Sequence, residues 1–110
     1  MSPTQSQIIF MYFQNFCKKD VASLEVLFSD SIVLTDWNVQ VVGKQNLLDF
    51  NQRFFNSVGN IRIDVDKIAI AQDTVIAEIR VIIADTEISV VDVIDFDQDN
   101  KIKEIRAYKR

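Results

Sequence analysis

Apolar residues in the first part of the chain recur every three or four positions, the spacing that places them on one face of an α-helix. In residues 2–19 this apolar stripe includes Ile9, Tyr12 and Phe16. The stretch opens with a sequence typical of a capping box, with Ser2 at the N-cap and a proline directly after it. These features predict a first helix that ends near residue 19.

Two further segments show helical spacing. Asp20 is a good N-cap for a short second helix, which is expected to end at Ser29. A longer third helix is predicted over residues 44–58 and ends at Gly59. Between these two helices, apolar residues alternate with polar ones over residues 31–37, and this alternation predicts a strand.

After residue 60 the apolar period changes to two, which is the period of β-strands. The alternation predicts four strands, near residues 61–71, 74–84, 86–97 and 101–109. The connections between them are short, so consecutive strands are expected to pair as an antiparallel meander. Helices followed by such a meander are typical of an α+β fold in which the helices cover one face of a curved sheet.

The second face of this sheet is also apolar. Ile76 and Ile82 alternate out of phase with the inward residues of one strand, and Val91 and Val93 do the same in the next strand. The predicted helices suffice for one face only, so the other face is expected to pack against a second copy of the chain. We therefore predict a homodimer that forms through the outer face of the sheet.

The composition limits the function classes. The 110 residues include two glycines and one proline, with no linker-like stretch, so we expect one domain over residues 1–110. The formal net charge of -4 argues against nucleic-acid binding, which needs clustered lysine and arginine. No segment approaches the ~20 apolar residues that span a bilayer, and the N-terminus lacks a secretory pattern. We therefore expect no membrane partner and a cytoplasmic location.

Three polar residues share the phase of inward apolar residues: Tyr12 in the first helix, Asp36 at the end of the first strand and Asp92 in the meander. Burial raises the pKa of a carboxyl toward the range useful for acid–base chemistry. Because the sequence has no histidine, any such chemistry is expected to use carboxylates. The alternatives are structural: a core tyrosine, a turn cap, and a buried carboxyl bonded to backbone amides, Arg80 or Arg106.

Three segments of the chain form a series with characteristic order and spacing. They are KDVASLEVLFSD at residues 19–30, VGKQNLLDF at residues 42–50 and DVIDFDQDNKI at residues 92–102. The series resembles the SnoaL-like and ketosteroid isomerase-like proteins of the nuclear transport factor 2-like superfamily, over essentially the whole chain. This resemblance implies a cone-shaped, curved and mostly antiparallel sheet, with three helices in the N-terminal half that enclose a pocket.

The resemblance also implies roles for the three inward polar residues. Steroid isomerases of this superfamily have an oxyanion-hole tyrosine eight residues before the aspartate that opens the second helix, as Tyr12 lies before Asp20. Their general base follows that aspartate by sixteen residues, where this chain has Asp36. Their second oxyanion donor, a protonated aspartic acid, matches Asp92. By this resemblance no cofactor and no metal is needed.

The ligand implied by the resemblance is a small apolar compound that carries a carbonyl group. The expected pocket wall consists of aromatic and aliphatic side chains: Phe13, Phe16, Trp37, Phe50, Phe54 and Ile94. Polyketide cyclases of the same superfamily also use an acidic residue in the pocket, so isomerisation and cyclisation are both consistent with the sequence. The alternative is a noncatalytic ligand-binding or dimerisation module, because a fold does not by itself determine a function.

Overall fold

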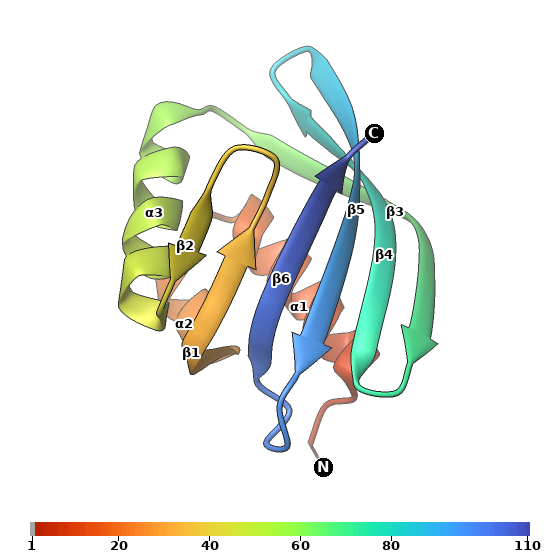
Figure 1. Cartoon of the computed structure of the whole chain (residues 1–110). Helices are drawn as coiled ribbons and strands as arrows, with labels where there is room; N and C mark the ends of the chain where they lie inside the picture. Colours follow the sequence, from red (N-terminus) through yellow and green to blue (C-terminus); the bar gives the residue numbers. More distant parts are fainter. Residues whose placement is uncertain (1) are drawn as a thin grey trace.

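The computed structural model describes residues 2–110 and arranges them as three helices and six strands. The helices are α1 (Gln5–Cys17), α2 (Val21–Glu25) and α3 (Lys44–Ser57). The strands are β1 (Phe28–Thr35), β2 (Gln40–Val42), β3 (Ile61–Ala71), β4 (Thr74–Ile83), β5 (Thr86–Phe96) and β6 (Ile102–Lys109). The α+β class, the three helices in the N-terminal half and the four long C-terminal strands are confirmed (Figure 1).

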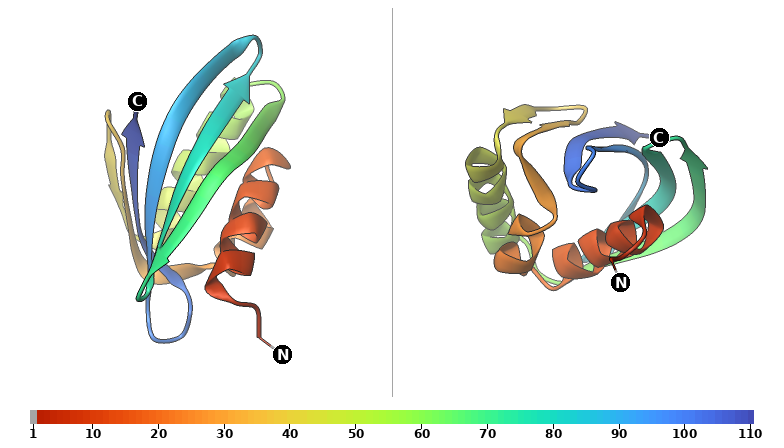
Figure 2. Two further views of the ribbon diagram at one scale, coloured as in Figure 1. Left: turned by 90° about the vertical axis from the view of Figure 1, so that its right-hand side faces the viewer. Right: turned by 90° about the horizontal axis from the view of Figure 1, so that it is seen from below.

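One curved sheet contains these six strands, in the order β2-β1-β6-β5-β4-β3. The strands from β3 to β6 form the predicted antiparallel meander, and β2 is antiparallel to β1. The pairing of β1 with β6 is parallel. Figure 2 shows the sheet curling toward the side on which α1 lies. α1 packs against β3 and β4, while α3 packs against β1 and β2, so the helices close the concave side.

The first helix begins later than the sequence predicts. Its N-cap is Thr4 and not Ser2: the Thr4 hydroxyl accepts from the backbone N–H of Gln7, and the Gln7 side chain accepts from the Thr4 N–H at 2.8 Å. This pair is a capping box of the predicted kind, placed two residues further along. Ser2 and Pro3 are exposed, so an additional helical turn would bury no apolar surface there.

A second correction concerns the first two strands. β1 begins at Phe28, three residues before the predicted start, because Phe28 pairs with Ile102 of β6. This partner lies far away in the sequence, so local alternation does not reveal it. β2 is not predicted at all, since three residues are too few to show a period. It forms because it continues from a turn that returns the chain along β1.

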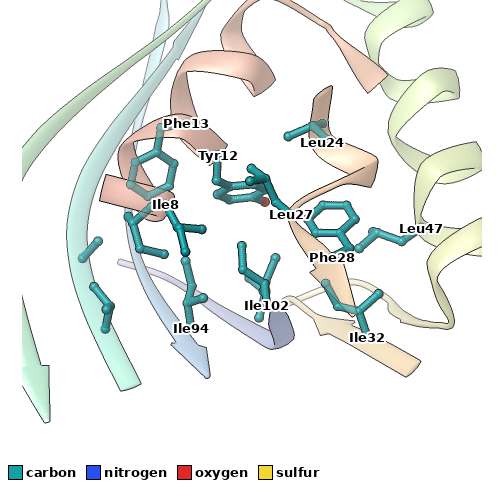
Figure 3. Close-up of a cluster of buried hydrophobic side chains, with 14 of the residues drawn as sticks. Ile8, Tyr12, Phe13, Leu24, Leu27, Phe28, Ile32, Leu47, Ile94 and Ile102 are labelled. Atoms are coloured by element: carbon teal, nitrogen blue, oxygen red, sulfur yellow. The ribbon is translucent and has the colours of Figure 1, made fainter. Parts of the chain in front are cut away.

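The hydrophobic core lies between α1, α2 and the inner faces of the strands (Figure 3). Tyr12 and Phe13 of α1 meet Phe28 of β1, Ile94 of β5 and Ile102 of β6 in one cluster. This cluster fills one end of the space that the curved sheet and the helices surround. The remaining part of that space is the candidate site.

Candidate functional site

A cavity of about 430 Å³ lies between α1, α3, the β1–β2 turn and the inner face of the sheet. Its volume falls in the range of roughly 300–1,000 Å³ that small-molecule sites occupy. Its wall is mostly apolar, and it includes five of the predicted wall residues: Phe13, Phe16, Trp37, Phe50 and Phe54. Tyr12, Asp36 and Asp92 also line it, so the three inward polar residues lie at one cavity.

Tyr12 enters this cavity from the buried face of α1, where only 6% of the residue is exposed. The rings of Phe16 and Phe28 lie 6.1 Å from its ring, measured between centroids, and hold it in an apolar environment. Burial raises the pKa of the Tyr12 hydroxyl far above its usual value, and the nearby Asp92 carboxyl raises it further. The hydroxyl therefore stays protonated and is available as a hydrogen-bond donor.

Asp92 projects from the inner face of β5 and is 7% exposed. Its neighbours across the sheet are Ala77 of β4 and Ala107 of β6, whose small side chains leave room beside the carboxyl. Burial raises the pKa of Asp92 to about 7, because an ionised carboxylate loses its hydration in an apolar wall. At neutral pH a large fraction of Asp92 is therefore the uncharged acid, which can donate a hydrogen bond.

Two arginines considered as partners of Asp92 lie elsewhere. Arg80 donates to Asp66, and Arg106 donates to Asp95 at 2.6 Å. These ion pairs involve residues out of phase with Asp92, on the outer face of the sheet. The interpretation of Asp92 as a carboxylate held by either arginine is therefore wrong.

Asp36 lies just after β1, in the turn that leads to β2. Its Oδ1 accepts from the backbone N–H groups of Asn38 at 2.7 Å and Val39 at 2.8 Å, and its own N–H donates to the Val39 carbonyl. Asp36 is half-buried rather than enclosed. Oδ1 thus caps the turn, as the structural alternative predicts. Oδ2 has no hydrogen-bond partner within residues 2–110, and Asp36 lines the cavity.

Trp37 follows in the same turn and is 43% exposed, so it forms the rim of the cavity. The Nζ atom of Lys109, at the end of β6, lies 5.9 Å from the centre of its ring, within the range of a cation–π contact. This contact ties the turn to the C-terminal strand at the open end of the cavity.

Ile94 is the one predicted wall residue that the structure places elsewhere. It is fully buried in the hydrophobic core and does not line the cavity. Ile94 has the same inward phase as Asp92 but lies two residues further along β5, where Val75 and Ile105 flank it and α1 covers it. Alternation predicts the face of a strand that a residue occupies, but it does not predict its depth along the strand.

Asn51 is a cavity residue that the sequence reasoning missed. It lies in α3 and is 3% exposed. It occupies the buried stripe of that helix, four residues after Leu47 and four before Phe55. A polar residue in phase with this stripe was the available signal, of the same kind that singled out Tyr12 and Asp92.

Tyr12, Asp92 and Asn51 share a further property. In the described part of the chain, none of their side chains has a hydrogen-bond partner, yet no buried side-chain nitrogen or oxygen is left both enclosed and unpartnered. Both conditions hold together only if the polar atoms of these side chains border open space. Because all three residues line the cavity, that space is the cavity.

Other kinds of site find little support in residues 2–110. These residues contain no group of three or more acidic, cysteine or histidine side chains placed to bind a metal ion. None of the helices they form has the length and apolar character needed to cross a membrane.

The fold and the cavity together define a class of small α+β pocket domains, in which a curved sheet is closed by helices. The chain matches the SnoaL-like domain over residues 10–105 and belongs to that family. The predicted resemblance to SnoaL-like proteins is thus confirmed. No curated protein matches the chain in sequence.

Solved structures of bacterial proteins share the fold at low sequence identity. A Shewanella putrefaciens protein provisionally assigned as a SnoaL-like polyketide cyclase has a TM-score of 0.87 and 17% identity, over 98% of this chain and 80% of that one. An NTF2-like protein of unknown function from Cytophaga hutchinsonii has a TM-score of 0.86 and 7% identity, over 100% of this chain and 93% of that one. A Kribbella flavida protein provisionally assigned as a ketosteroid isomerase has a TM-score of 0.85 and 12% identity, over 96% of this chain and 77% of that one. These similarities establish the fold and not an activity.

Proposed function

We propose that this chain is a cofactor-free enzyme that moves a proton α to the carbonyl group of a small apolar ligand, by isomerisation or cyclisation. One observation carries the proposal. Tyr12 and Asp92 are both buried in the apolar wall of one cavity, where burial raises the pKa of each side chain and so favours its protonated form. Two neutral donors in an apolar site are the arrangement that stabilises a developing enolate oxygen.

The reaction follows from the placement of these groups. The ligand carbonyl oxygen accepts hydrogen bonds from the Tyr12 hydroxyl and the neutral Asp92 carboxyl. When the bond between the α-carbon and its hydrogen breaks, the electron pair moves toward this oxygen, and the two donors bind the enolate more tightly than the ketone. The surrounding apolar wall strengthens both interactions because it excludes water.

Asp36 is the proposed proton acceptor. Its Oδ1 is occupied by two backbone N–H groups, while Oδ2 is unpartnered in the described chain. The proton from the α-carbon passes to Oδ2, and its return to a different carbon of the enolate completes an isomerisation. The carboxylate is regenerated, so the cycle needs no oxidant or reductant.

A noncatalytic ligand-binding module is the second candidate. The turn contacts of Asp36 favour it, because they give that residue a structural task that needs no chemistry. In this case Tyr12 and Asp92 would bind a carbonyl or phenol without turnover.

The test of the proposed site uses a naphthol, a planar phenol that mimics an enolate, and the fluorescence of Trp37. Trp37 is the single tryptophan of the chain and lies at the cavity rim, so its emission should report binding. Removing one donor should weaken naphthol binding about tenfold in Tyr12→Phe, whereas Tyr108→Phe, at an exposed tyrosine, should leave it unchanged. No binding to the folded wild-type protein would contradict the proposed site.

Turnover separates the enzyme from the binding module. If naphthol binds through Tyr12, β,γ-unsaturated ketones are the first substrates to assay. Isomerisation that Asp36→Asn abolishes would support the enzyme. Tight naphthol binding without turnover of any ketone or polyketide-like substrate would favour the module.

We also propose that a second copy of the chain covers the outer face of the sheet. There, Tyr108 is 56% exposed and lies opposite Val91, and Val93 lies opposite Ile76 on the next strand. On this face Glu78 also lies opposite Val91 and Arg106 lies opposite Val93, so charged residues border these apolar side chains. Val91→Arg should convert the dimer to monomers in sedimentation analysis, whereas Val26→Arg, at an exposed valine away from the sheet, should not. A monomeric wild-type protein would contradict the proposal.

A further inference from the structure

Asn51 stands at a helix position where an apolar residue would stabilise the protein more. It lies in the stripe of α3 that Leu47, Leu48 and Phe55 bury, and it is itself 3% exposed. Asparagine has a lower helix propensity than leucine, and its amide adds less apolar surface to the buried stripe than a leucine side chain would. Within residues 2–110 its side chain has no hydrogen-bond partner, and its amide borders the cavity. The structure therefore gives Asn51 no stabilising role.

The amide of Asn51 reaches the cavity from a wall different from those that carry the two proposed oxyanion donors. Tyr12 comes from α1 and Asp92 from β5, whereas Asn51 comes from α3, which packs against β1, β2 and α2. A ligand held by the first two residues can therefore also contact Asn51 with a different part of its surface. That contact would be polar, since an amide both donates and accepts hydrogen bonds.

The charged residues of the cavity wall indicate the charge of the ligand. The lining residues include two aspartates and no lysine or arginine. Lys109, the cation close to the rim, lies over Trp37 and is not part of the lining. An anionic ligand would have no cation to pair with in an apolar site and would face the two carboxyl groups. The site therefore favours a neutral ligand.

From this placement we infer that Asn51 binds a second polar group of the ligand and so determines specificity. The ligand class is a neutral, mainly apolar compound with two separated oxygen functions: the carbonyl group that Tyr12 and Asp92 bind, and a hydroxyl or second carbonyl that Asn51 binds. This inference rests on the proposed function, because it takes the first oxygen to lie at Tyr12 and Asp92. A hydroxyketone or a diketone satisfies it, whereas a simple hydrocarbon ketone does not.

The binding test compares a naphthol with dihydroxynaphthalenes that carry one hydroxyl on each ring. The wild-type protein should bind the best dihydroxynaphthalene about fivefold more tightly than naphthol, since one neutral hydrogen bond is added. Asn51→Leu, which removes the amide at similar volume, should abolish this preference and leave naphthol binding within about twofold. Asn56→Leu makes the same change on the exposed side of α3 and should keep the preference.

The Tm of Asn51→Leu distinguishes a ligand-binding asparagine from a structural one, because the two roles predict changes of opposite sign. Asn51→Leu adds an apolar residue to a buried helical stripe, so its Tm should equal or exceed that of the wild-type protein. A structural asparagine would instead lower the Tm on this change, because its partners would lose their hydrogen bonds.

The outcomes separate this inference from the proposed function. If naphthol binds but no dihydroxynaphthalene binds more tightly, or if Asn51→Leu keeps the preference, the role of Asn51 is wrong while the oxyanion site stands. A lower Tm for Asn51→Leu also overturns it. If neither probe binds the wild-type protein, the proposed site and the role of Asn51 both fail.

Discussion

Asp92 and Asp36 are two carboxyl groups at the wall of one cavity, in different surroundings. Asp92 lies deep on β5 with alanines at both sides, and burial raises its pKa to about 7. Asp36 lies half-buried in the turn after β1, where backbone N–H groups hold one of its oxygens. The surroundings of Asp92 favour a neutral acid, whereas those of Asp36 supply hydrogen-bond donors to one of its oxygens.

In the proposed mechanism this difference gives the two carboxyl groups two separate roles. A carboxyl in an apolar wall becomes a hydrogen-bond donor at the pH where a solvated carboxyl is an acceptor. The proposed chemistry needs one of each: a donor for the enolate oxygen and an acceptor for the proton. Variants that test the two proposed roles therefore alter one environment at a time.

The largest expected effect is the loss of turnover when the carboxylate of Asp36 is removed. Asp36→Asn keeps an oxygen that can accept from the backbone N–H groups of Asn38 and Val39 but removes the basic carboxylate. It should reduce kcat by about 10²–10⁴-fold, the contribution typical of a general base, with the folded structure retained. Turnover of a β,γ-unsaturated ketone measures this effect.

Two variants complete this comparison. Asp36→Ala also removes the turn cap, so it should lose the same activity and lower the Tm as well. Asp85→Asn, at an exposed position between β4 and β5, should change neither quantity. Full activity in Asp36→Asn would remove this residue from the mechanism.

The next largest effect is the pH dependence that the buried carboxyl of Asp92 gives to the free energy of unfolding. Asp92 has a pKa of about 7 in the folded protein, compared with 3.8 as its ordinary value. Between these two values the folded protein holds a proton that the unfolded chain releases. The contribution of Asp92 to the free energy of unfolding therefore falls as the pH rises from about 4 to about 7, and it is constant above that. The whole change is roughly 4 kcal/mol.

Asp92→Asn should remove this pH dependence and should make the protein more stable than wild type at about pH 8. Urea denaturation at about pH 5 and about pH 8 measures it for both proteins. Asp85→Asn should retain the wild-type dependence. Equal loss of stability in wild type and Asp92→Asn over this interval would show that Asp92 is not the group responsible.

Much of the fold follows from local periodicity. The three- and four-residue spacing predicts three helices, and the period of two after residue 60 predicts four strands whose ends agree with the structure within one residue. The same periodicity predicts the inward faces of Tyr12 and Asp92. These features are local, because they depend on side-chain direction in one helix or strand.

Other features depend on contacts between distant segments. The start of β1 at Phe28 requires its pairing with β6, and the position of Ile94 in the core requires the packing of α1 over β5. The turn bonds of Asp36 require the return of β2 along β1. Asn51 differs from these cases: its phase in α3 was visible in the sequence, and only its exposure to the cavity needed the structure.

The proposed donor role of Asp92 is tested most directly by titrating its carboxyl carbon with carbon-detected NMR, with Asp92→Asn used to assign the resonance. We expect a midpoint near pH 7, so that below about pH 7 most of Asp92 is a neutral hydrogen-bond donor at the cavity. A midpoint near 3.8, the ordinary value of aspartate, would contradict it. In that case the deep carboxyl would be ionised and could not stabilise an enolate.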